Sequence, residues 1–308
     1  MQQTRHKVTM LAGYGWMSLA VIIWASWLVL TSSGRTTSLS VVDLAGFRAA
    51  VPAVVLAPLL WHHRSTIVGL GPVRCLLLSA YGAPFTLFVG YGLGFAPVAH
   101  AGAMVPGLMP ILALALASIF LGQRLSRSHV VAVLLILLGA ATVLLRGADE
   151  IAGGDMWVGH LLFLSGAICW ASFAVTIRTF EISAFLATAI VGAISTIALL
   201  PVWFLAGLSN IGIANGPDLV FQLVFQGVFA GLVSVYAFSR ALKLVGASVS
   251  TLSALTPGVA ALLAVPVLDQ IPHPQDLVAL CLIVTGLVVG NRTPTQAHPG
   301  SMTKRDES

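Results

Sequence analysis

Long apolar runs separated by short polar loops make up most of the sequence. A helix crosses a bilayer with about 17–25 mostly apolar residues, and the chain holds ten runs of this kind. In order they are Met10–Thr31, Leu44–Trp61, Leu76–Phe95, Val98–Leu121, His129–Leu145, Trp157–Ile177, Ala184–Leu205, Leu219–Ser239, Val245–Leu268 and Leu277–Gly290. The last run is short, and the neighbouring Pro274–Asp276 can extend it. The pattern therefore predicts an all-α membrane protein with ten transmembrane helices.

The two ends of the chain are polar. The first run follows Arg5 and Lys7, as in a signal peptide, but it is longer than the apolar part of such a peptide, which has about 7–15 residues. It therefore predicts an uncleaved first helix after a short N-terminus, residues 1–9. The polar residues 292–308 predict a disordered tail.

The composition excludes a soluble domain. Of the 308 residues, 58% are hydrophobic and 8% are charged, whereas soluble domains have about 45–50% apolar and about 25% charged residues. The lipid bilayer is therefore the expected surrounding of most of the surface. Cys75, Cys169 and Cys281 all lie in apolar runs without metal-ligand spacing, which predicts packing and no metal site.

The basic residues gather on one side of the predicted membrane topology. With ten spans the two termini share a side, and twelve of the fifteen Lys and Arg residues fall on it, whereas Arg35 and Arg146 fall on the other. The twelve are Arg5, Lys7, Arg64, Arg74, Arg124, Arg127, Arg178, Arg240, Lys243, Arg292, Lys304 and Arg305. Cytoplasmic loops carry an excess of Lys and Arg, so both termini are expected in the cytoplasm. The net charge of +5 thus reflects topology, and no nucleic-acid partner is expected.

The two halves of the chain repeat one another. Trp24–Trp27 in the first run matches Trp170–Phe173 in the sixth at an offset of 146 residues, and Pro110 matches Pro257 at an offset of 147. These matches place repeat 1 at residues 10–146 and repeat 2 at residues 157–291.

The repeats are expected to be inverted. Each holds five runs, and five is odd, so the second copy enters the membrane from the opposite side. The charges agree, because the loop after the fourth run carries two arginines and its counterpart in repeat 2 carries two aspartates. Gly139 in the fifth run also matches Gly286 in the tenth, again 147 residues apart. Inverted repeats are typical of transporters that work by alternating access.

Three short segments stand out within the repeated five-helix halves: Phe47–Ala49, which contains Arg48, the stretch Pro106–Pro110, and Phe120–Leu125. Together with the halves themselves, they resemble the EamA-type permeases of the drug/metabolite transporter superfamily. Phe120–Leu125 is similar to the "LGE" end of the fourth helix in that family. Gln123 stands where the family usually has Glu, and Val267–Gln270 departs from the corresponding Gly-Glu type end. The seventh run has no equivalent of Arg48.

The resemblance implies a carrier in the bacterial cytoplasmic membrane that exports small organic metabolites, such as amino acids or related compounds, or drugs. Two alternatives stay open, a sugar-phosphate or nucleotide-sugar exchanger of the same superfamily and a membrane scaffold without transport. A homodimer also stays open. No enzyme activity and no cofactor are expected, because no set of acid, base and nucleophile converges at membrane depth and no Gly-rich nucleotide loop is present.

Arg48 is the sharpest candidate for a binding residue. A charge within a membrane span is costly, so it indicates a function by default, and a guanidinium can hold an anionic group with a planar fork of donors. Two structural roles remain open, in which Arg48 extends to the membrane interface or pairs with Asp43.

A central cavity is expected where the matched first and sixth runs meet, since inverted-repeat carriers bind substrate near the midplane. Aromatic and small polar side chains suit its wall. The candidates are Trp24, Ser26, Trp27, Cys169, Trp170, Ser172, Tyr91 and Tyr236, with Arg48 toward the outer end. Helix packing is the alternative role for the small polar residues, and the membrane interface is the alternative for Trp.

Three further residues are candidates for conformational or ion coupling. The matched Pro110 and Pro257 are expected hinges, because proline interrupts the hydrogen bonds of a helix. His100 is the candidate for proton coupling, since proton-coupled carriers use ionisable residues inside the membrane. The alternative for His100 is a solvated histidine at the membrane interface.

Overall fold

The computed structural model describes residues 2–34, 39–122, 126–150 and 155–291, and every regular element in them is a helix. The elements in chain order are α1 (Gln2–Gly34), α2 (Val41–Val55), α3 (Ala57–His62), α4 (Arg64–Ser79), α5 (Ala83–Gly92), α6 (Val98–Leu121), α7 (Arg127–Glu150), α8 (Met156–Phe180), α9 (Ala184–Leu205), the 3₁₀ turn η1 (Ile211–Ile213), α10 (Gly216–Gln222), the π-helix η2 (Leu223–Val233), α11 (Ser234–Val245), the 3₁₀-helix η3 (Ala247–Leu255), α12 (Thr256–Leu268) and α13 (Pro274–Asn291). The expected tail, residues 292–308, lies outside the described residues.

The chain is an all-helical, multi-pass membrane protein. Within the described residues, six helical segments are long and apolar enough to cross a bilayer, and they are Thr9–Gly34, Arg64–Gly92, Val98–Phe120, Met156–Ile177, Ala184–Leu205 and Gly216–Val245. Three shorter apolar helices accompany them, at Arg127–Thr142, Leu252–Leu268 and Pro274–Gly290. Each of the ten predicted runs coincides with a helix or with consecutive helices, and ten crossings remain a prediction.

Several predicted single helices are interrupted. Leu56 alone separates α2 from α3, and α3 begins with proline in its first turn, a position where the missing N–H costs little. Gly71, with φ of 77°, bends α4, because a left-handed backbone suits only glycine readily. Pro257 lies in the first turn of α12, directly after η3, whereas Pro110 lies inside α6. The two matched prolines thus occupy different local structures.

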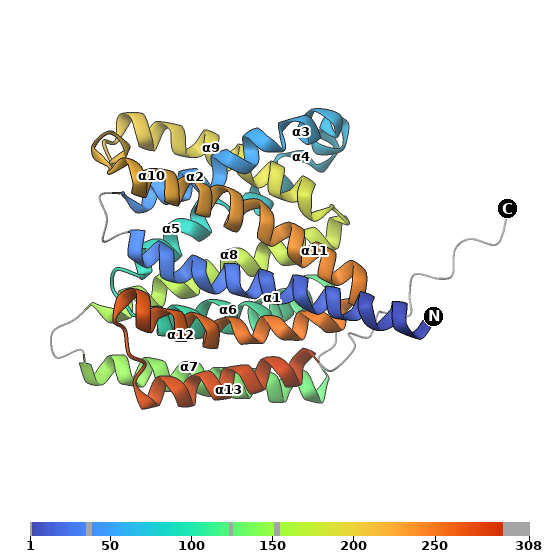
Figure 1. Cartoon of the computed structure of the whole chain (residues 1–308), viewed down its shortest axis with the longest axis vertical. Helices are drawn as coiled ribbons and strands as arrows, with labels where there is room; N and C mark the ends of the chain where they lie inside the picture. Colours follow the sequence, from blue (N-terminus) through green and yellow to red (C-terminus); the bar gives the residue numbers. More distant parts are fainter. Residues whose placement is uncertain (1, 35–38, 123–125, 151–154, 292–308) are drawn as a thin grey trace.

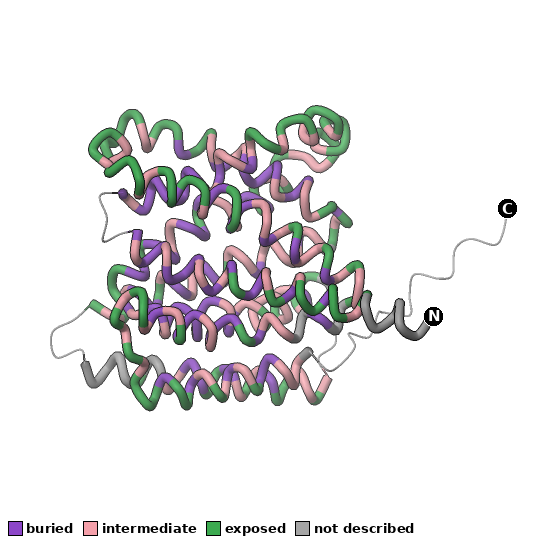
Figure 2. The backbone as a smooth tube through the Cα atoms, in the orientation of Figure 1, coloured by how far each residue is buried: buried purple, intermediate pink, exposed green. Residues whose placement is uncertain are grey.

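The helices form a bundle in which segments distant in sequence lie side by side (Figure 1). Helix α1 packs on α11 and α12, α2 packs on α9 and η2, α6 packs on α8 and α12, and α7 packs on α13. Figure 2 shows the buried residues between the helices and the exposed turns on the outside of the bundle. The main core cluster joins residues of α1, α5, α6, α7, α8, η2, η3, α12 and α13.

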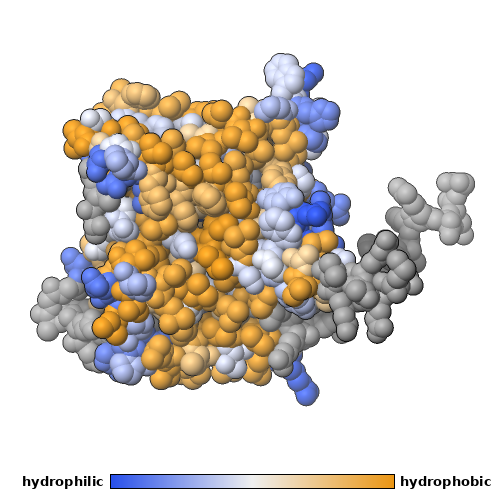
Figure 3. All heavy atoms as spheres, viewed as in Figure 1, coloured by the Kyte–Doolittle hydropathy of each residue, from blue (hydrophilic) through white to orange (hydrophobic). Residues whose placement is uncertain are grey.

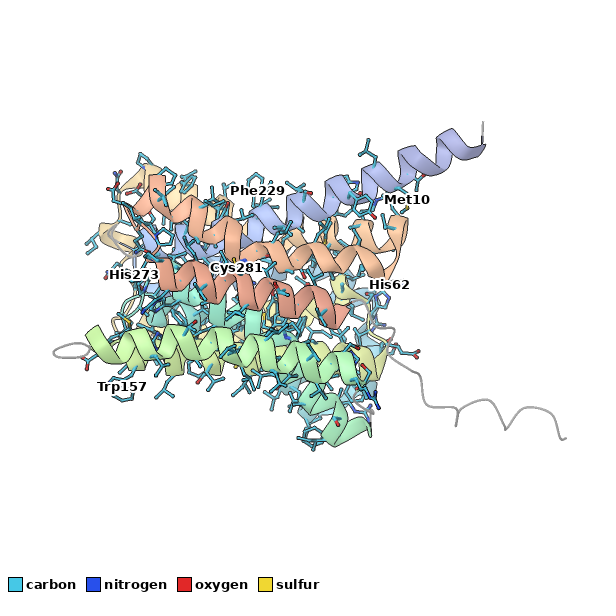
Figure 4. All side chains as sticks on the ribbon, turned by 90° about the horizontal axis from the view of Figure 1, so that it is seen from below. Met10, His62, Trp157, Phe229, His273 and Cys281 are labelled. Atoms are coloured by element: carbon cyan, nitrogen blue, oxygen red, sulfur yellow. The ribbon has the colours of Figure 1, made fainter. Side chains whose placement is uncertain are left out.

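The bundle has two ends. The start of α1 and the end of α13 lie at one of them, here called the proximal end, with Met10 and His62 (Figures 1 and 4). The opposite, distal end holds Trp157 and His273, at the starts of α8 and α13 (Figure 4). Figure 3 shows apolar residues across the middle of the face in view and polar residues toward both ends, as a bilayer requires.

The packing of α7 on α13 is very close at two matched glycines. A Cβ added to Gly139 would lie 2.8 Å from the carbonyl oxygen of Ala279, and one added to Gly286 would lie 2.9 Å from that of Ala132. These carbonyls belong to positions that are themselves 147 residues apart. Glycine therefore brings the two backbones together in the same way at two places.

Candidate functional site

A cavity of about 420 Å³ lies at the centre of the bundle. Its size falls within the range of about 300–1,000 Å³ that is usual for small-molecule sites. The described residues that line it include Trp24, Trp27, Arg48, Tyr81, Phe85, Pro106, Met109, Pro110, His129, Ile136, Trp170, Ala174, Phe238, Ser253, Thr256, Gly286 and Gly290. The wall is mostly apolar and aromatic, with a few polar groups at separate places.

Arg48 contributes the cationic group of this wall. Its Nη2 donates a hydrogen bond to the Tyr81 hydroxyl at 2.9 Å. The guanidinium carbon lies 4.6 Å from the ring centroid of Trp27 and 5.7 Å from that of Phe85, within the reach of cation–π attraction. A second, smaller cavity of about 30 Å³ also borders Arg48. The guanidinium therefore lies inside the bundle against aromatic faces.

The start of α2 explains how Arg48 comes to lie so deep. Ser40 and Asp43 form a capping box, in which the Ser40 hydroxyl accepts from the Asp43 N–H and the Asp43 carboxylate accepts from the Ser40 N–H. This cap begins the helix at Val41, three residues earlier than the apolar run. Arg48 is then seven residues into the helix, or roughly 10 Å along its axis at 1.5 Å per residue.

Asp43 does not neutralise Arg48. Its two carboxylate oxygens accept from the Ser209 hydroxyl at 2.7 Å and from the Asn210 N–H at 2.9 Å, which ties α2 to the segment after α9. Among the described residues no carboxylate forms an ion pair with Arg48, so the expected alternative of an Asp43 pair is wrong. The guanidinium has five N–H donors, and within the described residues one hydrogen bond uses them.

Trp27 is held in place by a buried amide. Its Nε1 donates to the side-chain oxygen of Gln226 in the π-helix at 2.9 Å. Gln226 in turn donates to the Thr31 hydroxyl and to Gln222, each at 3.2 Å, and Gln222 donates to the Leu30 carbonyl at 3.0 Å. These bonds join α1 to η2 and orient the Trp27 ring under Arg48. A buried glutamine within an apolar run was the signal that the sequence analysis missed.

Trp24 and Trp170 both line the cavity, together with Phe238. The Trp24 ring lies 5.5 Å from that of Phe238. Thr256 lines the same space and is 4% exposed, and its hydroxyl has no hydrogen-bond partner among the described residues. A buried polar group without a partner is costly, so this hydroxyl is available to a ligand or a water molecule.

The other candidate wall residues lie outside the described lining. Ser172 donates its hydroxyl to the Ile168 carbonyl of its own helix, and Cys169 packs against the main core cluster. Tyr91 and Tyr236 are exposed, and the ring of Tyr236 contacts that of Trp16. Ser26 is partly buried.

Of the two candidate hinges, Pro110 lines the cavity and Pro257 packs against Gly102 of α6.

His100 lies in a buried cluster at the distal end. Its Nδ1 is 3.0 Å from His160 Nε2, and its Nε2 is 3.3 Å from Asp276 Oδ1. His100 is 0% exposed, so the alternative of a solvated interfacial histidine is wrong. His160 and Asp276 are buried as well. We call these three residues the histidine cluster.

The cavity and the histidine cluster lie toward opposite ends of the bundle. The cavity reaches His129 in the first turn of α7 and Gly290 near the end of α13, both toward the proximal end. The histidine cluster joins the first turns of α6 and α13 to the second turn of α8 at the distal end. The cavity therefore extends toward the proximal end, and buried contacts between helices close the distal end.

The sequence matches the family model of the EamA-like transporter family over residues 11–145 and again over residues 157–292. The chain belongs to the EamA-like transporter family. Members of this family lie within the drug/metabolite transporter superfamily, and the protein is a membrane transporter of that type.

Two individual proteins are similar to this family member. The uncharacterized transporter YyaM of Bacillus subtilis (strain 168) is 27% identical over 163 residues, which cover 49% of this chain and 50% of YyaM. The match thus spans about half the length of that curated relative. A protein of known crystal structure superposes on this chain with a TM-score of 0.55 at 24% sequence identity. The match covers 92% of this chain and 95% of that one and shows a shared fold.

Proposed function

We propose that this family member is a ten-span carrier that moves small organic metabolites bearing an anionic group, such as amino acids or related compounds, across the bacterial cytoplasmic membrane by alternating access, in the direction of export. The observation that carries the proposal is Arg48, a guanidinium set into a central cavity with most of its donors unused by the described residues. Such donors suit a carboxylate, and the surrounding rings of Trp24, Trp27 and Trp170 suit an apolar body.

The packing of the helices supports two inverted five-helix repeats. The counterparts in the two repeats are α1 and α8, α5 and α11, and α6 and α12. When each helix is exchanged for its counterpart, the contact of α1 with α11 becomes that of α8 with α5. The contact of α1 with α12 becomes that of α8 with α6. The contacts of α2 with α9, α6 with α12 and α7 with α13 map onto themselves. A bundle whose contacts survive this exchange has two related halves that can swap conformations.

The cavity extends toward the proximal end, and the distal end is closed. This arrangement supports alternating access, with the cavity reached from the cytoplasm in this state. In this proposal the proximal end is cytoplasmic, because the predicted cytoplasmic side carries the basic loops. Arg64, Arg127, Arg240 and Lys243 are described and exposed on that side. The distal end is then extracellular.

The proposed topology predicts which engineered cysteines react from outside the cell. Ile213, exposed in the link after α9, should react with a membrane-impermeant thiol reagent in intact cells when replaced by cysteine in a chain whose native cysteines are alanine. Arg127→Cys should react only after the cells are opened. Labelling of position 127 but not of position 213 in intact cells would reverse the orientation.

The transport function is tested by filling the cavity. Ala174 lines the cavity from α8, so Ala174→Trp should place a large ring in the space that the substrate uses. We expect metabolites whose distribution between cells and medium depends on the wild-type chain to return to the level of cells without it. Untargeted metabolite profiling of both compartments measures this change.

A matched control lies on the same helix. Leu161 is exposed on the outside of α8, and Leu161→Trp should leave the metabolite distribution as in the wild type. Equal activity of the two variants at equal expression would contradict transport through this cavity. No metabolite that depends on the wild-type chain would contradict the carrier function and favour the scaffold.

The exchanger for phosphate-bearing substrates is less favoured by the cavity. A phosphate group is usually held by several Arg or Lys side chains, and Arg48 is the one such residue among the described residues that line the cavity. We therefore propose a monoanionic or zwitterionic group as the ligand of Arg48. Transport without a cofactor or a nucleic-acid partner, and without enzyme chemistry, is part of the same proposal.

A further inference from the structure

The histidine cluster is the most buried group of ionisable side chains in the described chain, and the cavity does not use it. His100, His160 and Asp276 are 0%, 4% and 7% exposed. They come from three helices, at positions 60 and 176 residues apart from His100. Ionisable residues buried at membrane depth indicate a function, and the chemistry of their hydrogen bonds shows which ligand they suit.

His100 lies between its two partners. An ionised Asp276 carboxylate can only accept, so His100 Nε2 carries a hydrogen and donates to it. In a neutral His100, Nδ1 is then the acceptor, and His160 Nε2 must donate. The cluster is therefore connected with both rings neutral.

One added proton keeps both hydrogen bonds. The added proton enters at Nδ1 of His160, and the hydrogen on Nε2 of His160 passes to Nδ1 of His100. His100 then donates from both ring nitrogens, to Asp276 and to Nε2 of His160, so the His100–His160 bond keeps its two atoms and reverses its direction. A second proton would place two cations at 3.0 Å, without an acceptor between the rings. The geometry therefore suits the binding of one proton and disfavours a second.

A metal ion suits the cluster less. His100 turns a different ring nitrogen toward each partner, so the three side chains do not direct lone pairs at one point. In the described part of the chain no group of three His, Cys, Asp or Glu residues could hold a metal ion. The proton is the ligand that fits this linear arrangement.

The neighbouring helices add few other ionisable groups at this end. Asp155 precedes α8, Asp269 follows α12, and His273 precedes α13, and all three are exposed. The His273 N–H donates to Asp276 Oδ2 at 2.9 Å and so fixes the carboxylate at the start of α13. The side chains of Arg146, Asp149 and Glu150 at the end of α7 lie outside the described residues.

The three joined helices also form walls of the cavity. Beyond His100, α6 carries Pro106–Leu114 along the cavity; beyond His160, α8 carries Trp170 and Ala174; and beyond Asp276, α13 carries Gly286–Gly290. Opening of the distal end along these walls separates at least two of the three helices. Any such movement stretches or breaks a bond of the cluster.

We propose that the histidine cluster binds the coupling proton of this carrier, and that its occupancy keeps the distal end closed. The inference rests on the proposed alternating access. Protonation of His100 turns its hydrogen bond to the ionised Asp276 into a buried ion pair, and separating the two charges inside the bundle is strongly unfavourable. The proton therefore stabilises the closed distal end. Its release weakens the contact between α6 and α13 and lets the distal end open.

The test follows the opening of the distal end as a function of pH, with protons as the only ligand. A cysteine at Ala174, inside the cavity, reports access from the distal side in proteoliposomes of uniform orientation that are treated outside with a membrane-impermeant methanethiosulfonate. A cysteine at the exposed Ile213 corrects for the reactivity of the thiol itself. The native cysteines are alanine in both chains.

The corrected labelling rate at position 174 should rise with pH. One titrating proton limits the rise to about tenfold per pH unit in its steepest part. His100→Gln and Asp276→Asn should each abolish the pH dependence, and His62→Gln, which removes an exposed histidine at the proximal end, should retain it. If the cluster variants do not fold, the slope of the otherwise wild-type chain alone decides.

The outcomes separate the two proposals. A labelling rate that does not change between pH 5 and pH 8, or a pH dependence that persists in His100→Gln, overturns the proton site and leaves alternating access in place. No labelling of position 174 from the distal side at any pH contradicts alternating access itself, and the proton site falls with it.

Discussion

Replacing Arg48 with lysine is expected to reduce transport by about tenfold or more. The guanidinium is planar, with its Nη2 bonded to Tyr81 and its face against Trp27, so its remaining donors are held in a fixed direction. A lysine ammonium keeps the charge but neither the fork nor the stacking. Loss of one charge-assisted hydrogen bond corresponds to about 1.5–3 kcal/mol, which is at least about tenfold at 1.4 kcal/mol per decade.

The measurement is the rate of appearance in the medium of the metabolites found by profiling, at matched expression. Arg74 supplies a control, because its guanidinium also lies on an aromatic ring, that of Phe180 at 4.3 Å, but it is not among the residues that line the cavity. Arg74→Lys should transport like the wild type. Wild-type rates in Arg48→Lys would remove Arg48 from the binding site.

The second large effect is expected on stability, from alanine at Gly139 or Gly286. In each case the new Cβ would lie less than 3.0 Å from a backbone carbonyl and from an isoleucine side chain of the opposite helix. A backbone carbonyl cannot relieve the clash by changing rotamer as a side chain can, so α7 and α13 must move apart. Overpacking of this kind usually costs about 1–3 kcal/mol. Because the two sites are equivalent, the two variants should lose similar stability.

Thermal unfolding of the detergent-solubilised chain, followed by size-exclusion chromatography, measures this loss. Gly258→Ala is the control, because its Cβ would lie 3.7 Å from the nearest atom, at ordinary contact distance, and alanine favours a helix over glycine. Its melting temperature should equal or exceed that of the wild type. A drop at only one of positions 139 and 286 would show that the two contacts are not equivalent.

The order of the helices could be predicted from the sequence, because each apolar run carries its own length and polarity. The interruptions were harder to foresee. Pro257 reads as a helix interior in the apolar pattern, yet η3 precedes it and makes it a first-turn proline. The π-helix at Leu223–Val233 has no signature in a hydrophobic pattern, since it lies within the longer, mostly apolar run Leu219–Ser239.

The site was predicted in part for the same kind of reason. Trp24 and Trp170 stood out because they lie at the middle of their apolar runs, and Arg48 because it is a charge inside one. The partners that give them their positions come from distant helices. Tyr81 is 33 residues from Arg48 and Gln226 is 199 residues from Trp27, and such contacts follow from the packing of the bundle and not from local spacing.

The histidine cluster shows the same limit more strongly. His100 was singled out as ionisable, but its depth was judged from its position near the end of a run. Burial there depends on how closely the N-terminal parts of α6, α8 and α13 meet, and on the Gln270 side chain, which accepts from the Val98 N–H at 3.0 Å. Neither the approach of these helices nor the hydrogen bond of Gln270 can be predicted from the hydrophobicity of a single helix.

The aromatic wall of the cavity also gives this protein a built-in optical signal. Trp24, Trp27 and Trp170, three of its seven tryptophans, line the space, and indole fluorescence depends on the polarity and the quenching groups around the ring. The Trp27 ring in addition lies 4.6 Å from the Arg48 guanidinium, so a bound anion changes the electric field at that ring. Binding in the cavity should therefore change the tryptophan emission spectrum of the unlabelled chain.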